Sequence, residues 1–569
     1  MIRTSLAALL CACALATPAT DAATAADPLQ ADTILTHGQF HTPDGWAEAA
    51  AIRRGVIIAI GDTAAVAHHK GPGTKVIDLQ GATVLPGLHD MHVHPLDGGL
   101  NQLQCMFAQG SAQAVVVAAV RKCAAAHAKG EWIIGGQWDT SSLGGHPDWK
   151  GLDKAAPDNP VALNDISLHA LWVNSAALRL AGITAATANP SGGIIERDAH
   201  GKPTGVLRES ATELVRSLIP AYSVEQNANA LLWSMRLMMS HGITSFTDAM
   251  VDESALRAYA TLADRGELKQ RVKACLTYGI DDPNPTAGGK YDYIALRNLY
   301  ARERFAPSCI KMFLDGVPTD AHTAAMVEQY ADTTNPNDPR AKGLLLIPQE
   351  QLNEALVRFD AQGFTVKMHA AGDGAVRAGL DAIAAARKTN GFSGLLHEVA
   401  HDSFVQVSDI ERARQLGATF EFSPYIWYPN PIIPDIVKAV GGERMRRWIP
   451  VKEALDAGAL VVPGSDWSVV PSVNPWIAIE TLVTRQQPGG GKDELGAAEK
   501  ITLDQAIDAF TVSSAREMGD RNKVGSLERG MLADLIVLDR NPYRIPITQV
   551  HDTKVMMTMI NGEMVYGAN

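Results

Sequence analysis

The sequence of 569 residues has little charge, few cysteines and no long apolar run outside its first residues. Charged residues make up 20% of the chain, and 62 acidic residues outnumber 50 basic ones, so the net charge is −12. This balance argues against nucleic acid or an anionic membrane as a partner, because both bind basic surfaces. No apolar run is long enough to span a bilayer, so no permanent membrane anchor is expected.

Only six cysteines are present, and two of them lie within the first 25 residues. The other four have no Cys-x-x-Cys spacing, so the signature of a thiolate zinc site is missing. In an exported protein Cys105 and Cys123 could form a disulfide, and the alternative is that both are buried as small apolar residues. Cys275 and Cys309 lie in strand-like runs and are expected to be buried and unpaired.

The first 25 residues have the pattern of a secretory signal peptide. Arg3 precedes an apolar run at 6–16, and small residues follow up to Ala23-Thr24-Ala25, which is an A-x-A cleavage site. The sequence therefore predicts a signal peptide over residues 1–25 and an exported protein, either periplasmic or secreted.

Short apolar runs alternate with amphipathic helical segments along most of the chain. Helical segments at 348–363 and 372–391 each end at glycine, the usual C-terminal stop. Eight strands with intervening helices predict an α/β fold, a closed parallel (β/α)8 TIM barrel. The eight strand-like runs are 82–94, 242–249, 271–279, 310–316, 364–370, 395–401, 418–424 and 460–467.

The two ends of the chain differ from this pattern. Residues 26–81 and 524–569 contain short β-like runs with turn residues, and each has too little apolar surface for a core of its own. They are predicted to pair into a small β-sandwich built from both termini. Residues 82–523 form the barrel, with an insertion after the first barrel strand, at about 101–235, that is expected to lie over the barrel mouth.

Titratable side chains occur at the C-terminal ends of the predicted strands, where catalytic groups of such barrels lie. His92 and His94 are two residues apart and therefore face the same side, and Asp90, which precedes them, is expected to play a supporting role. Imidazole and carboxylate groups together suit zinc or a similar divalent metal. The other candidate ligands are Lys311, His369, His401 and Asp466.

Each candidate also has an ordinary interpretation. A single buried histidine is more often a hydrogen-bonded structural residue, Asp466 could cap a following helix, and Lys311 could extend out of the barrel. A lysine inside an apolar strand is costly to bury without compensation, which makes Lys311 the least ordinary of the six. The occurrence of all six at the ends of successive strands favours a metal centre.

Several motifs resemble the metal-dependent amidohydrolase superfamily, and in particular its YtcJ-like branch, amidohydrolase family 3, which includes N-substituted formamide deformylase. The resemblance covers essentially the whole chain after the signal peptide. The motifs are VLPGLHDMHVHP (84–95), DISLHALWVNSAAL (165–178), GKPTGVLRES (201–210), GITSFTDA (242–249), IKMFLDG (310–316), HAAGDGAV (369–376), VAHD (399–402), GSDW (464–467) and VGSLERGMLADLIVLDRNP (524–542).

The resemblance implies roles for individual residues. His92 and His94 match the first-strand metal ligands, and Lys311 matches a lysine that many members carboxylate to bridge two metals. His369, His401 and Asp466 match the ligands on the fifth, sixth and eighth strands. One departure occurs at the sixth strand, where EVAH replaces the common Arg-Ile-Glu-His, so the arginine and glutamate neighbours of the ligand are missing.

The expected activity is hydrolysis of an amide-type C–N bond in a small molecule by metal-activated water. One or two divalent ions, expected to be zinc, would lie at the centre, with Asp466 as the proton shuttle. In a one-metal variant His401 would stabilise the developing oxyanion. The alternatives are a deaminase, a lactonase or esterase on the same barrel, or a non-catalytic secreted binding protein. Association into a homo-oligomer stays open.

The insertion supplies candidate substrate contacts. Trp138, Trp172, His169 and Asn174 combine aromatic and polar groups within an apolar stretch, as pockets for apolar acyl or amine groups do. The alternative is that the aromatic rings pack the insertion against the barrel.

Overall fold

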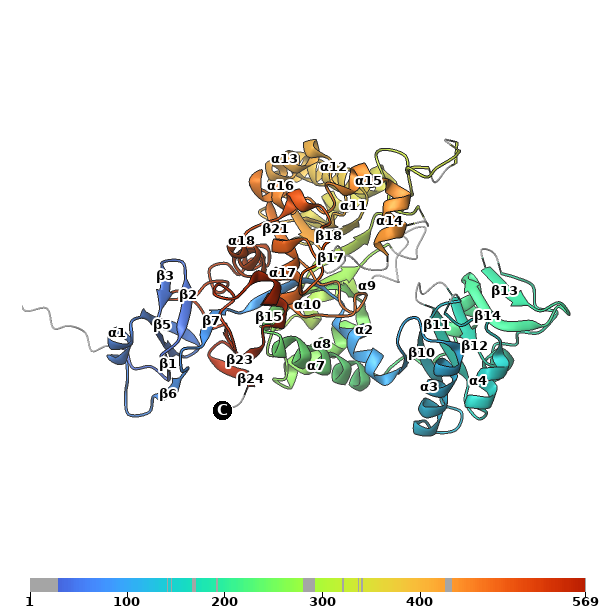
Figure 1. Ribbon diagram of the computed structural model, residues 1–569, viewed down its shortest axis with the longest axis horizontal. Coiled ribbons are helices and arrows are strands. Elements are labelled where there is room, and N and C mark those ends of the chain that lie inside the picture. The colour runs from blue at the N-terminus through green and yellow to red at the C-terminus, as the bar shows by residue number, and fades with distance from the viewer. Residues whose placement is uncertain are drawn as a thin grey trace, which may run out of the picture.

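The computed structural model divides the chain into a β-sandwich, a central barrel and a separate lobe (Figure 1). It describes residues 29–567, except 141, 145, 166–169, 191–192, 280–291, 320–321, 336, 339–340, 425–431 and the side chain of residue 209. The predicted signal peptide and His169 lie outside the described residues.

Eight parallel strands form the central sheet, so the predicted (β/α)8 barrel is confirmed. Neighbouring strands pair in sequence order from β15 to β21, and β8 pairs with β15. The strands are β8 (Leu88–Val93), β15 (Ile243–Val251), β16 (Arg271–Thr277), β17 (Phe305–Phe313), β18 (Thr365–Ala370), β19 (Glu398–His401), β20 (Thr419–Phe422) and β21 (Leu460–Pro463).

Helices follow the strands and bury their apolar faces against the barrel. In α12 (Asp373–Asn390) the buried side chains include Val376, Leu380 and Ile383, which recur at helical spacing, and the helix ends at Gly391 with a positive φ of 80°. The other helices around the barrel are α2 (Pro95–Leu100), α7 (Val224–Ser240), α8 (Glu253–Asp264), α9 (Asp292–Ala295), α10 (Arg297–Tyr300), α11 (Gln349–Ala361), α13 (Val407–Leu416), α14 (Ile433–Val440), α15 (Gly442–Met445), α16 (Val451–Asp456), α17 (Pro475–Thr484), α18 (Leu503–Asp508) and α19 (Ser514–Glu517).

The run expected as one strand at 82–94 is divided at Gly87 into two strands. Its first half, β7 (Thr83–Pro86), pairs with strands of the β-sandwich, and its second half, β8, begins the barrel. A Cβ atom at Gly87 would lie 2.3 Å from the Thr244 side chain, so the chain passes too close to β15 for any other residue. This run therefore belongs to both domains.

The first and last barrel strands meet at the C-terminal end of the barrel. The backbone N–H of Asp466 donates to the carbonyl of His92 at 2.7 Å, and Val93 forms an isolated parallel bridge with Trp467. The barrel thus closes next to the histidine motif of β8.

Both ends of the chain build the β-sandwich, as the sequence predicts. One sheet has the order β5-β4-β1-β6, and the other, β24-β23-β22-β7-β2-β3, combines strands from both ends. Their shared core includes Phe40 and Ile52 together with Leu535 and Met559. The elements are β1 (Thr33–Thr36), β2 (Gln39–Thr42), β3 (Gly45–Ala47), β4 (Ala49–Arg53), β5 (Val56–Gly61), α1 (Thr63–Ala67), β6 (Lys75–Asp78), β22 (Leu535–Leu538), β23 (Val555–Ile560) and β24 (Glu563–Gly567).

The insertion folds into a lobe that stands apart from the barrel in Figure 1 and does not lie over its mouth as expected. A six-stranded sheet has one apolar cluster around Trp138 and Trp172 and another around Leu171 and Leu207, so the lobe buries its own apolar surface. Its elements are β9 (Cys105–Met106), α3 (Gln113–Ala126), β10 (Ile133–Trp138), α4 (Trp149–Ala155), β11 (Val161–Asp165), β12 (Ala170–Val173), α5 (Ser175–Leu180), β13 (Gly193–Arg197), β14 (Pro203–Glu209) and α6 (Glu213–Arg216).

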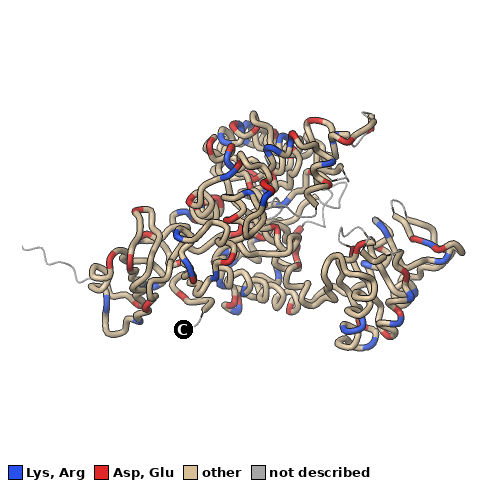
Figure 2. Tube along the Cα trace, viewed as in Figure 1, with Lys and Arg blue, Asp and Glu red and all other residues tan. Residues whose placement is uncertain are grey.

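Charged residues of both signs are interspersed over all three parts (Figure 2). Among the described helices, none combines the length and the apolar character that a bilayer crossing requires.

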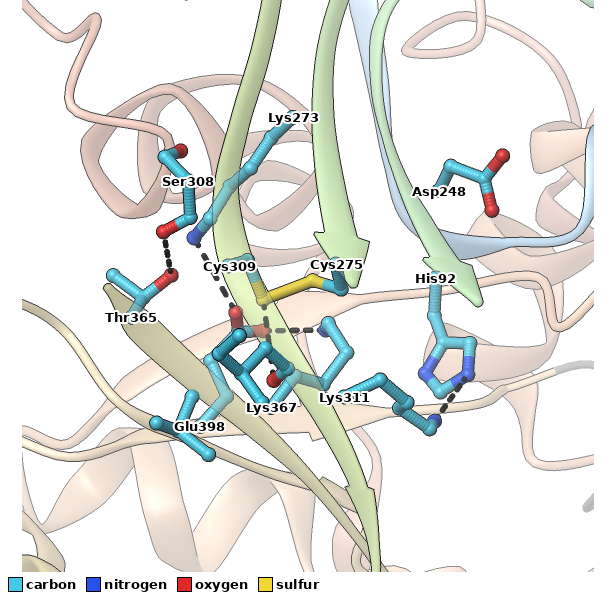
Figure 3. Close-up of a disulfide and its surroundings, with 12 residues drawn as sticks. His92, Asp248, Lys273, Cys275, Ser308, Cys309, Lys311, Thr365, Lys367 and Glu398 are labelled. Carbon is cyan, nitrogen blue, oxygen red and sulfur yellow. Dashed lines mark hydrogen bonds and ion pairs between the residues drawn. A yellow bond between two sulfur atoms is a disulfide. The ribbon is translucent and has the colours of Figure 1, made fainter. Parts of the chain in front are cut away.

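Two disulfides cross-link the described chain. Cys105 bonds to Cys123 within the lobe, which settles the pairing that the sequence left open. Cys275 bonds to Cys309, so the expectation that these two cysteines are unpaired was wrong. The parallel register of β16 and β17 places Cys275 directly opposite Cys309, a neighbourhood that their spacing of 34 residues does not reveal (Figure 3).

Removing the barrel disulfide should destabilise the protein. Because the cross-link closes a loop of 34 residues in the unfolded chain, the double variant Cys275→Ala/Cys309→Ala should lose about 2–4 kcal/mol of unfolding free energy. Guanidinium unfolding without reductant, followed by intrinsic fluorescence, measures the change. An unchanged transition would mean that the two thiols are unpaired in solution.

Candidate metal centre

All six predicted ligands converge at the C-terminal ends of the barrel strands. Lys311 Nζ lies 3.1 Å from His92 Nε2, and Asp466 Oδ1 lies 3.2 Å from His94 Nε2 and 3.7 Å from His92 Nε2. The His401 ring lies between the others, with its centroid 4.6 Å from that of His92 and 4.4 Å from that of His369. Figure 3 shows the side chain of Lys311, on β17, extending towards His92.

Hydrogen bonds orient three of the four imidazoles through the same ring atom. Nδ1 of His92 contacts Glu421, Nδ1 of His369 contacts Asp315 at 3.0 Å, and Nδ1 of His401 contacts Ser423 at 3.1 Å. This arrangement leaves Nε2 of each ring available to ligate a metal. Metal-bound histidines usually make such an outer hydrogen bond through their other ring nitrogen.

The backbone is bent where the ligands from β19 and β21 project. His401, Asp402 and Asp466 have positive φ values of 76°, 43° and 58°, a region that residues other than glycine rarely adopt. Such strain persists only where the surrounding structure fixes it, and it is concentrated at functional sites. The bends lie at the end of β19 and just after β21, where His401 and Asp466 turn towards the other candidate ligands.

Asp90 supports the centre through hydrogen bonds to the backbone. One of its carboxylate oxygens accepts from the backbone N–H of His92 at 3.2 Å and from that of Ser465 at 2.9 Å. The carboxylate therefore ties the first strand to the loop that carries Asp466.

Burial keeps two of the histidines neutral. His92 and His401 are buried, and loss of solvation holds the pKa of each imidazole well below the ordinary value. A neutral imidazole is the form that binds a metal, so protons do not compete for these nitrogens near neutral pH.

Lys311 is buried, and its amine loses its charge readily. Burial, followed by the charge of nearby Lys367, lowers the pKa of Lys311 to about 7. A large fraction of this amine is therefore unprotonated at neutral pH, which is the state required for nucleophilic or ligating behaviour.

A row of buried charges beneath the ligands was not predicted from the sequence. Lys367 Nζ lies 2.5 Å from Glu398 and 3.9 Å from Glu421, and Lys273 contacts both Glu398 and Glu517. Figure 3 shows Lys273, Lys367 and Glu398 of this row. The sequence contained a signal for these buried charges, because each charged residue interrupts an apolar run. Lys367, for instance, stands two residues before His369 and faces the same side of β18.

The donor set fits a divalent metal. Two groups of three residues each have ligand atoms that all lie within 4.8 Å of one another. The first group is His92, His94 and Asp466, and the second is His92, His401 and Glu421. Neutral imidazoles with a carboxylate are the usual ligands of zinc and similar ions. His94 Nδ1 is buried without a hydrogen-bond partner among the described residues, so this ring also has capacity for a further contact.

A cavity of about 730 Å³ adjoins the centre, and His94 forms part of its wall. The rest of the wall comes from α2, α7, α8, α9 and the ends of β15 and β16, with Tyr222 just before α7. A volume of this order suits a small organic molecule. Among the described residues, none from the lobe between 105 and 216 lines this cavity.

The lobe residues expected to contact substrate are buried inside the lobe. The indole N–H of Trp138 donates to the carbonyl of Leu163, that of Trp172 donates to the carbonyl of Asp148, and Asn174 caps α5. These partners give the three side chains a role in lobe packing, contrary to the expected substrate contact. The tryptophans in this part of the sequence belong to the apolar core of the lobe.

Comparisons with known proteins agree with this geometry. A family model described as the Amidohydrolase family matches residues 75–566. Protein LONG AFTER FAR-RED 3 of Arabidopsis thaliana is 30% identical over 554 residues, covering 94% of this chain and 92% of that protein. N-substituted formamide deformylase of Arthrobacter pascens is 27% identical over 546 residues, covering 94% of this chain and 98% of that protein.

A solved structure shows the same architecture. An uncharacterized metal-dependent hydrolase from Pyrococcus furiosus matches with a TM-score of 0.71 and 26% identity, covering 90% of this chain and 100% of that one.

Glu421 should control metal affinity through His92. Burial raises the pKa of Glu421 to about 8, and a metal ion on His92 would favour the ionised carboxylate, which orients the imidazole and makes it more basic. Glutamine cannot ionise, so Glu421→Gln should weaken zinc binding about 10- to 100-fold. Competition with a fluorescent chelator measures the dissociation constant.

The matched control is Glu480→Gln, because Glu480 is also buried and accepts from a histidine, His551, at 2.7 Å. Its zinc affinity should stay at the wild-type value. Equal losses in both variants would mean that Glu421 acts only through general stability.

Proposed function

The chain belongs to the amidohydrolase family, and from this premise we propose that it hydrolyses the amide bond of a small molecule after export from the cytoplasm. The protein is a metal-dependent hydrolase of the amidohydrolase type that acts on C–N bonds, as the motifs of the first strand predict. The amide, the export and the choice of zinc are the proposed parts.

One observation carries the proposal: three imidazoles, each oriented through Nδ1, share the barrel mouth with Asp466 and Lys311. When bound there, a divalent ion lowers the pKa of water towards neutrality and polarises a substrate carbonyl. The residues that would hold it are His92, His94, Lys311, His369, His401 and Asp466.

Asp466 is placed to move the proton. Its carboxylate lies beside His94 and His92 at the mouth of the barrel, and it is almost completely buried. As a general base it would accept a proton from the attacking water, and as a general acid it would return that proton to the leaving amine. His401, at the centre of the ring cluster, would stabilise negative charge on the carbonyl oxygen where only one ion is bound.

Lys311 has a second proposed role. Its unprotonated amine can add carbon dioxide through a new N–C bond and release one proton, which gives an anionic carbamate that would serve as a metal ligand. This change would also remove the energetic cost of a buried ammonium group beside four imidazoles.

Export is supported by two features. The first 25 residues have the pattern of a signal peptide, and two disulfides join the four remaining cysteines. Disulfides of this kind persist in oxidising compartments and are rare in the cytosol. These two features support a secreted or periplasmic location.

A substrate screen tests the reaction. Zinc-loaded protein should hydrolyse members of a panel of N-acyl amino acids, formamides and cyclic amides, with release of the amine. Release of ammonia from aminated rings would instead indicate a deaminase, and cleavage confined to lactones or esters would overturn the amide assignment.

Asp466→Asn should retain the fold and the metal but lose about 10²- to 10⁴-fold in kcat, the usual contribution of a general acid–base group. Asparagine is the appropriate replacement because it tolerates the positive φ at this position. Zinc content and steady-state kinetics provide the measurement. Full activity in the variant would exclude the proton shuttle.

Lys311→Ala should lose bound metal, and added short carboxylic acids should restore it by occupying the space of the missing ligand. Metal analysis after dialysis, with and without propionate, tests this. Lys269→Ala is the control, because Lys269 pairs with Glu563 at the protein surface. Unchanged metal content in Lys311→Ala would indicate a centre that does not use the lysine.

A further inference from the structure

The wall of the cavity beside His94 combines apolar surface with several hydrogen-bond acceptors. Four carboxylates line it, from Asp97, Asp248, Asp252 and Glu253, and Arg257 is the one lysine or arginine among the described lining residues. His94 belongs to both the cavity wall and the metal centre, so a molecule in the cavity reaches the reacting groups.

Two of these carboxylates are already engaged. Asp252 caps α8 by accepting from the backbone N–H of Ala255 at 2.9 Å and from the Ser254 hydroxyl at 2.8 Å. Glu253 pairs with the Arg257 guanidinium, which neutralises the positive charge of the wall. Neither carboxylate therefore needs a ligand as its partner.

Asp97 and Asp248 remain, and neither forms an ion pair with a lysine or arginine among the described residues, so that His94 is the basic group of the wall that acts on them. The carboxylate of Asp97 has no side-chain hydrogen bond or ion pair among the described residues. Asp248 is buried and accepts from the Tyr259 hydroxyl at 2.8 Å and from the backbone N–H of Met250 at 3.2 Å, both neutral donors. Burial raises the pKa of Asp248 to about 7, so a nearby cation would stabilise its ionised form.

Two further acceptors lack partners. Asn227 is 3% exposed and lines the cavity, yet its Oδ1 atom has no hydrogen-bond donor among the described residues. The buried hydroxyl of Thr277, on the same wall, also has none. Because buried polar atoms are nearly always satisfied in a functioning protein, these atoms point to a donor supplied by a ligand.

An inorganic cation does not fit this wall. Outside the metal centre, no three His, Cys, Asp or Glu ligand atoms of the described residues come within 4.8 Å of one another. The acceptors are spread around a cavity of about 730 Å³ whose wall also includes Leu96, Met250 and Tyr293. An organic ammonium group on an apolar body matches both features.

We propose that this cavity binds a positively charged nitrogen of the substrate, so that the preferred substrate is an amide carried by a cationic molecule, such as an acylated diamine. Asp97 and Asp248 supply the opposing charge, and Asn227 and Thr277 accept hydrogen bonds. The inference rests on the proposed amide hydrolysis for the identity of the reacting bond, but not for the binding of the cation.

The test compares two ligands of similar shape, benzylammonium and neutral benzyl alcohol, by calorimetric titration of the zinc-loaded protein. Benzylammonium should bind about tenfold more tightly or better, since a hydrogen bond to a charged group is worth more than one to a neutral group. The preference should persist in metal-depleted protein, where the amine has no ion to ligate.

Asp97→Asn should remove most of this preference, by about tenfold in relative affinity, and should leave the binding of benzyl alcohol unchanged. The matched control is Glu354→Gln, which removes one exposed negative charge on α11, outside the cavity wall, and should preserve the preference. Excess calcium should not displace benzylammonium.

Equal binding of the two ligands, or a preference that Asp97→Asn leaves unchanged, would overturn the inference. Displacement by calcium would also overturn it, in favour of an inorganic cation. Each result is independent of turnover. A protein that hydrolyses neutral amides without preferring cations would retain the proposed function, and one that binds benzylammonium selectively but hydrolyses no amide would lose only that function.

Discussion

The candidate centre depends on closure of the barrel between its first and last strands. β8 and β21 lie at opposite ends of the barrel sequence, and the hydrogen bond from Asp466 to the His92 carbonyl joins them at the level of the ligands. A Cβ atom at Gly464 would lie 2.3 Å from that of His92, so only glycine permits this approach. Without closure, the histidines of β8 would not meet the carboxylate of Asp466.

Closure places buried charges beneath the centre, and these charges must satisfy one another. Acidic and basic side chains alternate along a row of contacts that runs from Glu421 through Lys367, Glu398 and Lys273 to Glu517 on α19. Burial of an isolated charge costs several kcal/mol, whereas a complete row is tolerated because each member has an opposite neighbour. The row ends at Glu421, which orients His92, so packing of the barrel interior and ligand geometry are linked.

The three parts of the molecule contribute differently to the chemistry. The barrel supplies all six candidate ligands, and its own elements form the cavity beside them, with Tyr222 just before α7. The lobe satisfies Trp138, Trp172 and Asn174 internally, whereas the described wall of the cavity beside His94 comes from barrel elements, among them α2, α8 and the end of β15.

The sequence by itself determined the barrel, the two-ended sandwich and the six ligands, because strand periodicity and the position of charged residues at strand ends are local properties. Only the tertiary structure decided which residues are neighbours across strands: Cys275 with Cys309, Glu421 with His92, and Asp315 with His369. It also decided that the lobe stands apart, since whether an apolar face is buried internally or against another domain depends on three-dimensional packing. Pairing register and domain placement are properties of the whole chain, and no local pattern encodes them.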